Sequence, residues 1–298
     1  MIRIGMDPNI ISTGAFTLSW HGVLTIVGVV LAIFLIALWA SKSQPMLNWV
    51  EQYAKKGKAK GPDDKTKRGM AQDIVYSVAV WAILGGILGA RLVHVIDRWD
   101  FYGQNPGQIV AVWSGGIAIY GAVLGGFVGG AIYCRIKKFP VGILADITAP
   151  ALILAMAVGR IGDIINGEHL SKTTTMAWGF VYSHPSSLSN QVFGYTPTHP
   201  AVVYEMIWDL LVMGMLWKLR ARFHPHGMLF ILFLALYSLG RFTISFLRED
   251  KVWLGGLTEA HIIAIVIMAV AVPVLVYKAQ WVKKTRPPAG AVKKRRTG

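Results

Sequence analysis

The decisive stretch of this 298-residue chain is Gly159-Arg160-Ile161-Gly162-Asp163-Ile164-Ile165-Asn166-Gly167-Glu168. It follows an apolar run, residues 149–158, and closes a segment long enough to cross a bilayer. An arginine, an aspartate, an asparagine and a glutamate thus lie close together at the edge of the hydrocarbon. A charged side chain at mid-bilayer costs about 2.5 kcal/mol or more, and such residues usually have a function. The stretch therefore indicates a membrane fold with a site inside it.

The composition supports a multispanning membrane protein. Hydrophobic residues make up 54% of the chain and charged residues 15%, and the mean hydropathy is +0.50. The formal charge is +15, but the basic residues gather in a few loops and the tail, which is typical of cytoplasmic, lipid-facing segments. We therefore expect no nucleic-acid partner. No basic region precedes the first apolar run, so we expect no cleavable signal peptide.

The apolar runs predict an all-α integral membrane protein with about seven spans in one domain. The expected spans are residues 16–40, 74–96, 111–134, 141–165, 200–217, 227–247 and 257–277. The positive-inside rule then predicts an outside N-terminus and a cytoplasmic C-terminus. Residues 166–198 form the longest outside segment, a candidate head or lid over the site, and residues 278–298 form a basic cytoplasmic tail. Cys134 is the single cysteine, and we expect a buried structural thiol.

This topology brings several polar clusters to the outer side of the membrane. Four clusters lie in the opening stretch, in residues 119–121, in residues 199–205 and at Arg241. His21, near the start of the first span, and Arg91, in the second span, are added to them. The candidate site residues are His21, Tyr120, Arg160, Asp163, Asn166, Glu168, His199, Tyr204, Glu205 and Arg241. The alternative is that these charges are structural ion pairs that tie spans together.

The chemistry of these residue types suits an anionic lipid. A planar guanidinium binds a phosphate through two parallel hydrogen bonds, which favours Arg160 and Arg241 as headgroup contacts. Glu168 and Glu205 are candidates to orient the arginines or to accept hydrogen bonds from substrate hydroxyls. We expect no metal, because the paired histidines 224 and 226 are a weak pattern. A serine hydrolase elbow and a zinc protease motif are missing from the sequence.

The sequence resembles the bacterial phosphatidylglycerol–prolipoprotein diacylglyceryl transferases over nearly its whole length. The family form of the opening stretch is Gly-Arg-x-Gly-Asn-Phe-x-Asn-x-Glu-x-x-Gly. Asp163 stands where Asn is usual, Ile164 where Phe is usual and Ser171 where the final Gly is usual.

Further segments match the family in the correct order. Residues 113–126 resemble Trp-x-Gly-Gly-x-x-x-His/Tyr-Gly-x-x-x-Gly-Gly, with Tyr120 at the His/Tyr position. Residues 199–205 resemble His-Pro-x-x-Leu-Tyr-Glu, and residues 240–248 resemble Gly-Arg-Phe…Glu-Phe-x-Arg, with Ser245 in place of the Glu. His21 stands where a Tyr before Gly is usual.

The resemblance implies a reaction without a cofactor. A diacylglyceryl group passes from phosphatidylglycerol to the lipobox cysteine thiol of a prolipoprotein signal peptide, and glycerol phosphate is released in the bacterial plasma membrane. Arg160 and Arg241 would then stabilise the departing phosphate. The resemblance implies Tyr120 as proton acceptor, but a neutral tyrosine is a poor base at neutral pH. We therefore hypothesise His21 as a second candidate.

Two alternatives stay open. Because Asp163, Ser171, Ser245 and His21 depart from the family pattern, the chain is either a divergent working enzyme or a relative with altered substrate or an inactive, anionic-lipid-binding role. A small-solute transporter is a further alternative, which would require internal repeat symmetry.

Overall fold

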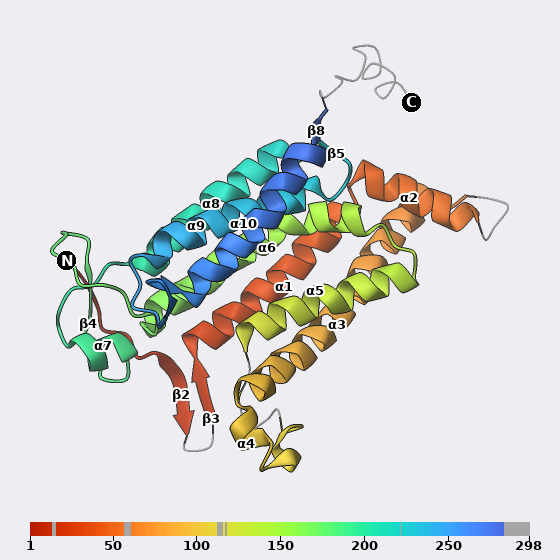
Figure 1. Ribbon diagram of the computed structural model, residues 1–298. Helices are drawn as coiled ribbons and strands as arrows, with labels where there is room; N and C mark the ends of the chain where they lie inside the picture. The colour runs from red at the N-terminus through yellow and green to blue at the C-terminus, as the bar shows by residue number, and fades with distance from the viewer. Residues whose placement is uncertain (14–15, 57–60, 112–115, 117, 221, 283–298) are drawn as a thin grey trace. The chain divides into compact units, whose positions relative to one another are not determined.

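The computed structural model describes residues 1–13, 16–56, 61–111, 116, 118–220 and 222–282, without the side chains of Phe16, Ile119 and Tyr120. Most of the described chain is helical (Figure 1). The longer helices are α1 (Trp20–Ala40), α3 (Asp64–Asp97), α5 (Ile119–Ile136), α6 (Val141–Asn166), α8 (Ala201–Leu219), α9 (Met228–Ser245) and α10 (Glu259–Lys278). The shorter ones are α2 (Gln44–Lys55), α4 (Trp99–Tyr102), α7 (Leu188–Phe193) and the 3₁₀ helix η1 (Pro106–Gln108).

Short strands lie before the first helix, in connections between later helices and after the last helix. They form the pairs β1 (Ile2–Ile4) with β4 (Phe180–Tyr182), β2 (Asn9–Thr13) with β3 (Phe16–Ser19), β5 (Phe223–His224) with β8 (Gln280–Trp281), and β6 (Val252–Leu254) with β7 (Leu257–Thr258). The β1–β4 pair is parallel and the others are antiparallel. Strand β1 thereby joins the N-terminus to the segment between α6 and α8.

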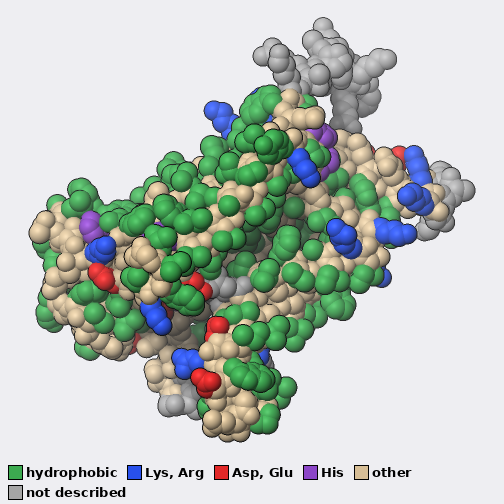
Figure 2. All heavy atoms as spheres, viewed as in Figure 1, with side chains coloured by type: hydrophobic (Ala, Val, Ile, Leu, Met, Phe, Trp, Pro, Cys, Tyr) green, Lys and Arg blue, Asp and Glu red, His purple; other side chains and the backbone are tan. Residues whose placement is uncertain are grey.

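Among the described residues, five helices are long and apolar enough to cross a bilayer: α1, α3, α6, α9 and α10. Their outward side chains are apolar; Leu88 on α3 is 72% exposed and Val276 on α10 is 73% exposed. Figure 2 shows hydrophobic side chains over much of the visible face of these helices. Such exposure is costly in water and favourable in lipid, so the expected membrane class is confirmed, with a described chain that is mostly helical and carries short strands.

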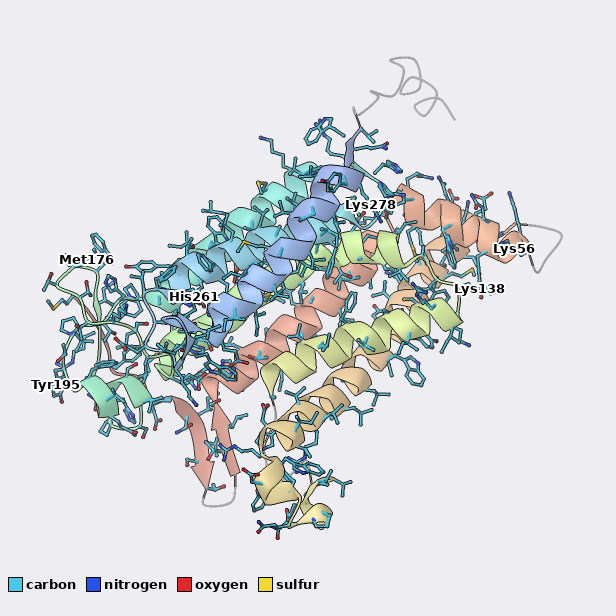
Figure 3. All side chains as sticks on the ribbon, in the orientation of Figure 1. Lys56, Lys138, Met176, Tyr195, His261 and Lys278 are labelled. Carbon is cyan, nitrogen blue, oxygen red and sulfur yellow. The ribbon has the colours of Figure 1, made fainter. Side chains whose placement is uncertain are left out.

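The described chain divides into two compact units. The first contains Met1–Gly28 and Leu152–Gly298, and the second contains Val29–Ala151. In the first unit α9 packs against both α8 and α10 (Figure 1). Figure 3 shows Lys278 and His261 toward opposite ends of α10, with Met176 and Tyr195 in the segment between α6 and α8. The basic end of α10 thus lies away from that segment.

Glycines set the packing of α3 on α5 in the second unit. A Cβ at Gly89 would lie 2.8 Å from the Cα of Gly125, and a Cβ at Gly85 would lie 3.0 Å from the Cα of Gly129. Only glycine permits so close an approach of two helix backbones. Cys134, on the same helix α5, is 3% exposed in an apolar cluster, as expected of a structural thiol.

The observed helices differ from the expected spans mainly at their N-terminal ends. The first helix begins at Trp20 because residues 16–19 pair with β2 as strand β3. Helix α3 begins ten residues before the expected span, where Asp63 caps it by accepting a hydrogen bond from the Thr66 backbone N–H at 3.0 Å. The expected loop 41–72 contains the amphipathic helix α2, whose Met46 and Val50 are fully buried.

Candidate active site

The candidate site residues gather where helix ends of the first unit meet. Helix α6 carries Arg160 and Asp163 in its last two turns, α8 carries Glu205 near its start, and α9 carries Arg241 about one turn before its end. His21 is the second residue of α1. Four helices thus deliver polar groups to one region.

Glu205 is the centre of an arginine cluster. Its side chain is 4% exposed, and its Oε2 lies 2.8 Å from Nη1 of Arg160. Its Oε1 pairs with Nη1 of Arg241 and lies 3.4 Å from Nη1 of Arg248. A buried carboxylate requires such partners, because an unpaired charge away from water is costly. Glu205 therefore holds three guanidinium groups around one point.

Asp163 is the second centre and is joined to the first through Arg160. Its Oδ2 lies 3.1 Å from Nη1 of Arg160 and 3.3 Å from Nε2 of His169, and its Oδ1 is hydrogen-bonded to Nδ1 of His21. The His169 ring also contacts Arg248, with 2.9 Å between its Nδ1 and the arginine Nη2. The polar network is therefore continuous from His21 to Arg248.

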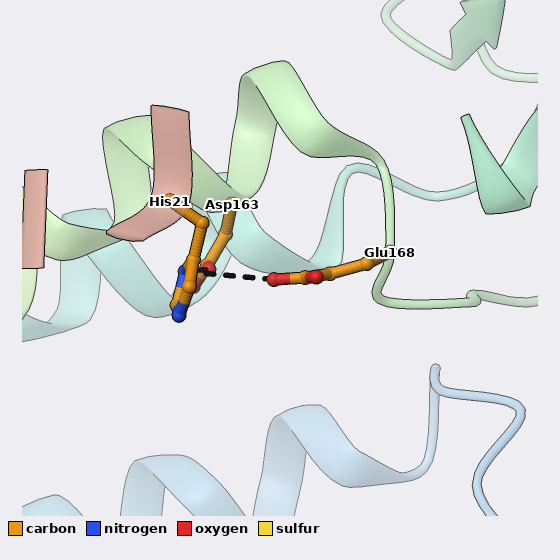
Figure 4. A group of neighbouring side chains, drawn as sticks. All are labelled: His21, Asp163 and Glu168. Carbon is orange, nitrogen blue, oxygen red and sulfur yellow. Dashed lines mark hydrogen bonds and ion pairs between the residues drawn. The ribbon is translucent and has the colours of Figure 1, made fainter. Parts of the chain in front are cut away.

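His21 is fixed by its backbone as well as by its ring. Its N–H donates to Oδ1 of Asn166 at 3.3 Å, and a Cβ at Gly162 would lie only 2.6 Å from its Cα. Figure 4 shows His21, Asp163 and Glu168 pointing toward one another, and Oε1 of Glu168 lies 3.5 Å from the His21 Nδ1. The glycine and the asparagine thus position the imidazole against two carboxylates.

The same three side chains are the one set in the described residues whose spacing would suit a metal ion, with ligand atoms within 4.8 Å of one another. The guanidinium of Arg160 and the ring of His169 already bind the second oxygen of Asp163. A cation there would face a fixed positive charge at close range. The arrangement fits a hydrogen-bond network better than a metal centre.

The segment between α6 and α8 is anchored beside the arginine cluster. The Lys172 N–H donates to the Leu247 carbonyl at 2.9 Å, and the Glu249 N–H donates to the Leu170 carbonyl at 3.1 Å. The Trp178 indole N–H donates to the Tyr204 hydroxyl at 2.8 Å. The root of the segment is therefore held on both α8 and the end of α9.

Tyr182 ties the same segment to the end of α6. Its hydroxyl donates to the Ile164 carbonyl at 2.9 Å. Burial, assisted by the charge of Asp163, raises the pKa of Tyr182 above its ordinary value. The hydroxyl therefore stays protonated and keeps its donor role across the physiological pH range.

Comparison with known proteins gives this geometry a family. The model of the prolipoprotein diacylglyceryl transferase family matches residues 8–277. The chain belongs to the prolipoprotein diacylglyceryl transferase family. The expected resemblance and the expected transferase class are thereby confirmed.

Curated relatives in this transferase family match almost end to end. A phosphatidylglycerol–prolipoprotein diacylglyceryl transferase of Limosilactobacillus reuteri (strain DSM 20016) is 32% identical over 280 residues, which cover 93% of each chain. The protein of the same name from Dehalococcoides mccartyi (strain CBDB1) is 30% identical over 286 residues, covering 96% of this chain and 98% of the relative. That from Trichormus variabilis is 33% identical over 267 residues, covering 87% and 84%.

In this family member most of the predicted site residues meet in one network. Direct contacts join His21, Arg160, Asp163, Asn166, Glu168, Glu205 and Arg241. Tyr204 and His199 lie at its edge, with ring centroids 6.3 Å apart. The His199 Nδ1 is buried and has no hydrogen-bond partner among the described residues.

Two other candidates fall outside this network. The side chain of Tyr120, which belongs to the second unit, lies outside the described part of the chain. Arg91 donates from Nε to the Ile109 carbonyl at 2.8 Å and from Nη1 to the Gly116 carbonyl at 2.9 Å, all within the second unit. These backbone contacts give Arg91 a structural role.

Glu168 and Glu205 have different partners. Glu168, a candidate to orient an arginine or to accept a hydrogen bond from a substrate hydroxyl, contacts His21, because it follows the end of α6 and turns toward the start of α1. Ser245 removes a carboxylate from α9, yet Arg241 has Glu205 of α8 as its partner. The charge of Arg241 is thus balanced across helices.

Sequence reasoning missed several members of the cluster. Arg248 and His169 join its two centres, and Asp209 is 1% exposed one turn after Glu205. Tyr237 lies one turn before Arg241 on α9. Spacing of one helical turn from a predicted charge was the available signal for Asp209 and Tyr237.

Proposed function

We propose that the chain transfers the diacylglyceryl group of phosphatidylglycerol to the lipobox cysteine of prolipoproteins, the first step of bacterial lipoprotein maturation. The family membership and the names of the relatives support this function. The partners are then phosphatidylglycerol, the signal peptide of a prolipoprotein and the surrounding membrane lipids.

The observation that carries the proposal is the pair of arginines on Glu205. The side chains of Arg160 and Arg241 are 13% and 20% exposed, whereas that of Arg248 is 4% exposed. Both ion pairs of Arg160 use Nη1, so its Nε and Nη2 remain for a phosphate. Arg160 and Arg241 are therefore the phosphate contacts, and Arg248 and Glu205 hold them in position.

The reaction replaces one bond at the glyceryl carbon. The lipobox thiol loses its proton, the sulfur forms a C–S bond, and the C–O bond to the phosphate breaks with its electron pair on oxygen. The leaving group is glycerol phosphate, whose charge Arg160 and Arg241 stabilise in a site of low dielectric. A thiol with an ordinary pKa of about 8.5 requires a proton acceptor, for which Tyr120 and His21 are the candidates.

The remaining site residues fit roles in substrate binding. Asn166 and Asp163 position the α1 start and Arg160, and Glu168 has a carboxylate for a glycerol hydroxyl. Tyr204 and His199 lie where the segment between α6 and α8 joins the helices. These roles place them around the headgroup rather than at the reacting bond.

The proposed topology has seven spans. Helix α5 adds an apolar stretch, Gly121–Ile136, and α8 adds a helix whose Glu205 and Asp209 belong to the site. With basic loops inside, the N-terminus is outside, the C-terminus is cytoplasmic, and residues 166–198 form a head on the outer side of the plasma membrane. The site then faces the outer leaflet.

Complementation tests the function. In a bacterium depleted of its own transferase, the wild-type chain is expected to restore growth and the mobility shift of a mature lipoprotein, and Arg160→Ala is expected to restore neither. Immunoblots of membranes check that both chains are present. Failure of a well-expressed wild-type chain would instead support a relative with altered substrate or an inactive lipid-binding role.

A further inference from the structure

The contact between His21 and Asp163 is the feature from which a further inference follows. The ring nitrogen Nδ1 of His21 is hydrogen-bonded to Oδ1 of Asp163, and Oε1 of Glu168 faces the same nitrogen at 3.5 Å (Figure 4). The second oxygen of Asp163 is approached by the guanidinium of Arg160 at 3.1 Å and by Nε2 of His169 at 3.3 Å. His21 thus presents Nδ1 to two carboxylates.

This arrangement selects one tautomer of the neutral imidazole. An ionised carboxylate only accepts hydrogen bonds, so the ring must carry its proton on Nδ1. The lone pair of a neutral His21 is therefore on Nε2, the nitrogen on the opposite side of the ring. Proton acceptance at Nε2 leaves a positive ring beside Asp163, which stabilises it.

Accessibility distinguishes the two partners. The side chain of His21 is 38% exposed, whereas that of Asp163 is 4% exposed. The imidazole is therefore the part of the pair that a substrate reaches, and the aspartate is its buried support. A histidine and a buried acid in these positions are the elements of an activated proton acceptor.

Resting on the proposed function, we propose that His21 takes the proton of the lipobox thiol at Nε2, with Asp163 as its positioning residue. The S–H proton moves to Nε2, the thiolate attacks the glyceryl carbon, and the phosphate oxygen leaves with the electron pair of the C–O bond. Asp163 also holds Arg160, so one carboxylate aligns the base with the phosphate contact. The thiol and the leaving group are therefore oriented together.

The test uses the full chain in lipid nanodiscs that contain phosphatidylglycerol, with a lipobox peptide as acceptor. His21→Gln keeps a hydrogen-bond donor for Asp163 but removes the base, so we expect a loss of kcat of about 100-fold or more. Its rate should rise about tenfold per pH unit up to the thiol pKa near 8.5, because only the free thiolate then reacts. The wild-type rate should reach its plateau at a lower pH than that of His21→Gln, because His21 takes the thiol proton.

A second substrate separates chemistry from structure. A peptide with selenocysteine at the lipobox position is ionised at neutral pH and needs no base. We expect it to restore most of the activity of His21→Gln, which a structural defect would not allow. The matched control is His184→Gln, because His184 faces Asp7 at 3.7 Å outside the site and should leave both profiles unchanged.

The positioning role has its own readout. Asp163→Asn should lower kcat more in the wild-type background than in the His21→Gln background, because the part of its role that acts through the imidazole is already lost there, whereas its contact with Arg160 is lost in both. An active wild type with an unchanged His21→Gln profile, or equal losses with both peptides, would overturn the inference while leaving the transferase function intact. An inactive wild type would instead refute the proposed function.

Discussion

At the scale of single residues, Glu205 decides whether the arginine cluster holds together. Its one buried carboxylate is shared by Arg160, Arg241 and Arg248. If Glu205 loses its charge, three positively charged guanidinium groups stay close together with no shared carboxylate between them. The loss of one partner from a buried ion pair typically costs about 3–5 kcal/mol, far more than an exposed pair contributes.

We therefore expect Glu205→Gln to lower the thermal unfolding midpoint of the detergent-purified chain strongly and to abolish transfer. Glu51→Gln is the matched control, because Glu51 pairs with Lys55 at 2.8 Å and Lys67 at 3.1 Å on a 36% exposed side chain. Hydrogen bonds from Lys55 and Lys67 lower the pKa of Glu51, but water screens both of these ion pairs. Similar midpoints for the two variants would contradict a structural role for Glu205.

At the scale of elements, the close packing of α3 on α5 depends on glycine backbones. Cβ atoms at Gly89 and Gly125 would each lie within 3 Å of the Cα of the other. Lipid supplies no hydrophobic force between apolar helices, so such backbone contact is what associates them. Any larger side chain separates the two axes.

Gly89→Val is accordingly expected to destabilise the second unit by about 1–3 kcal/mol, the usual cost of overpacking. The measurement is the unfolding midpoint in detergent together with the monodisperse fraction on size exclusion. Gly214→Ala is the control, because nothing lies within 4 Å of the position of its Cβ, and it should retain the wild-type midpoint. An unchanged midpoint for Gly89→Val would show that α3 and α5 do not need their backbones this close together.

At the scale of the whole molecule, the proposed topology is open to chemical labelling. Cys134 is the single cysteine and is 3% exposed, so the unmodified chain should react little with a membrane-impermeant maleimide. In spheroplasts, Ser186→Cys should react and Lys137→Cys should react only after permeabilisation, because the proposed topology has the first in the outside head and the second in a cytoplasmic turn. The reverse pattern would invert the orientation.

Much of the architecture was predictable because membrane spans are local in sequence. Apolar length and flanking lysines predicted the membrane helices, the two Gly-Arg pairs predicted Arg160 and Arg241, and the His-Pro-x-x-Val-Tyr-Glu segment predicted Glu205. The first residues of the helices were harder to predict from the sequence, because the pairing of β3 and the Asp63 cap determine where α1 and α3 begin. No motif indicated His169, and Asp209 was indicated only by its spacing of one helical turn from Glu205.

The sequence by itself determined the class, the family and the candidate residues, because hydropathy, charge distribution and motifs are properties of neighbouring positions. Tertiary structure alone decided which side chains meet, since that depends on how each helix is rotated against the next. His21 and Asp163 are 142 positions apart and read in sequence as two separate departures from the family pattern. In the folded chain they are hydrogen-bonded to each other, because the missing Cβ of Gly162 lets the start of α1 approach the end of α6.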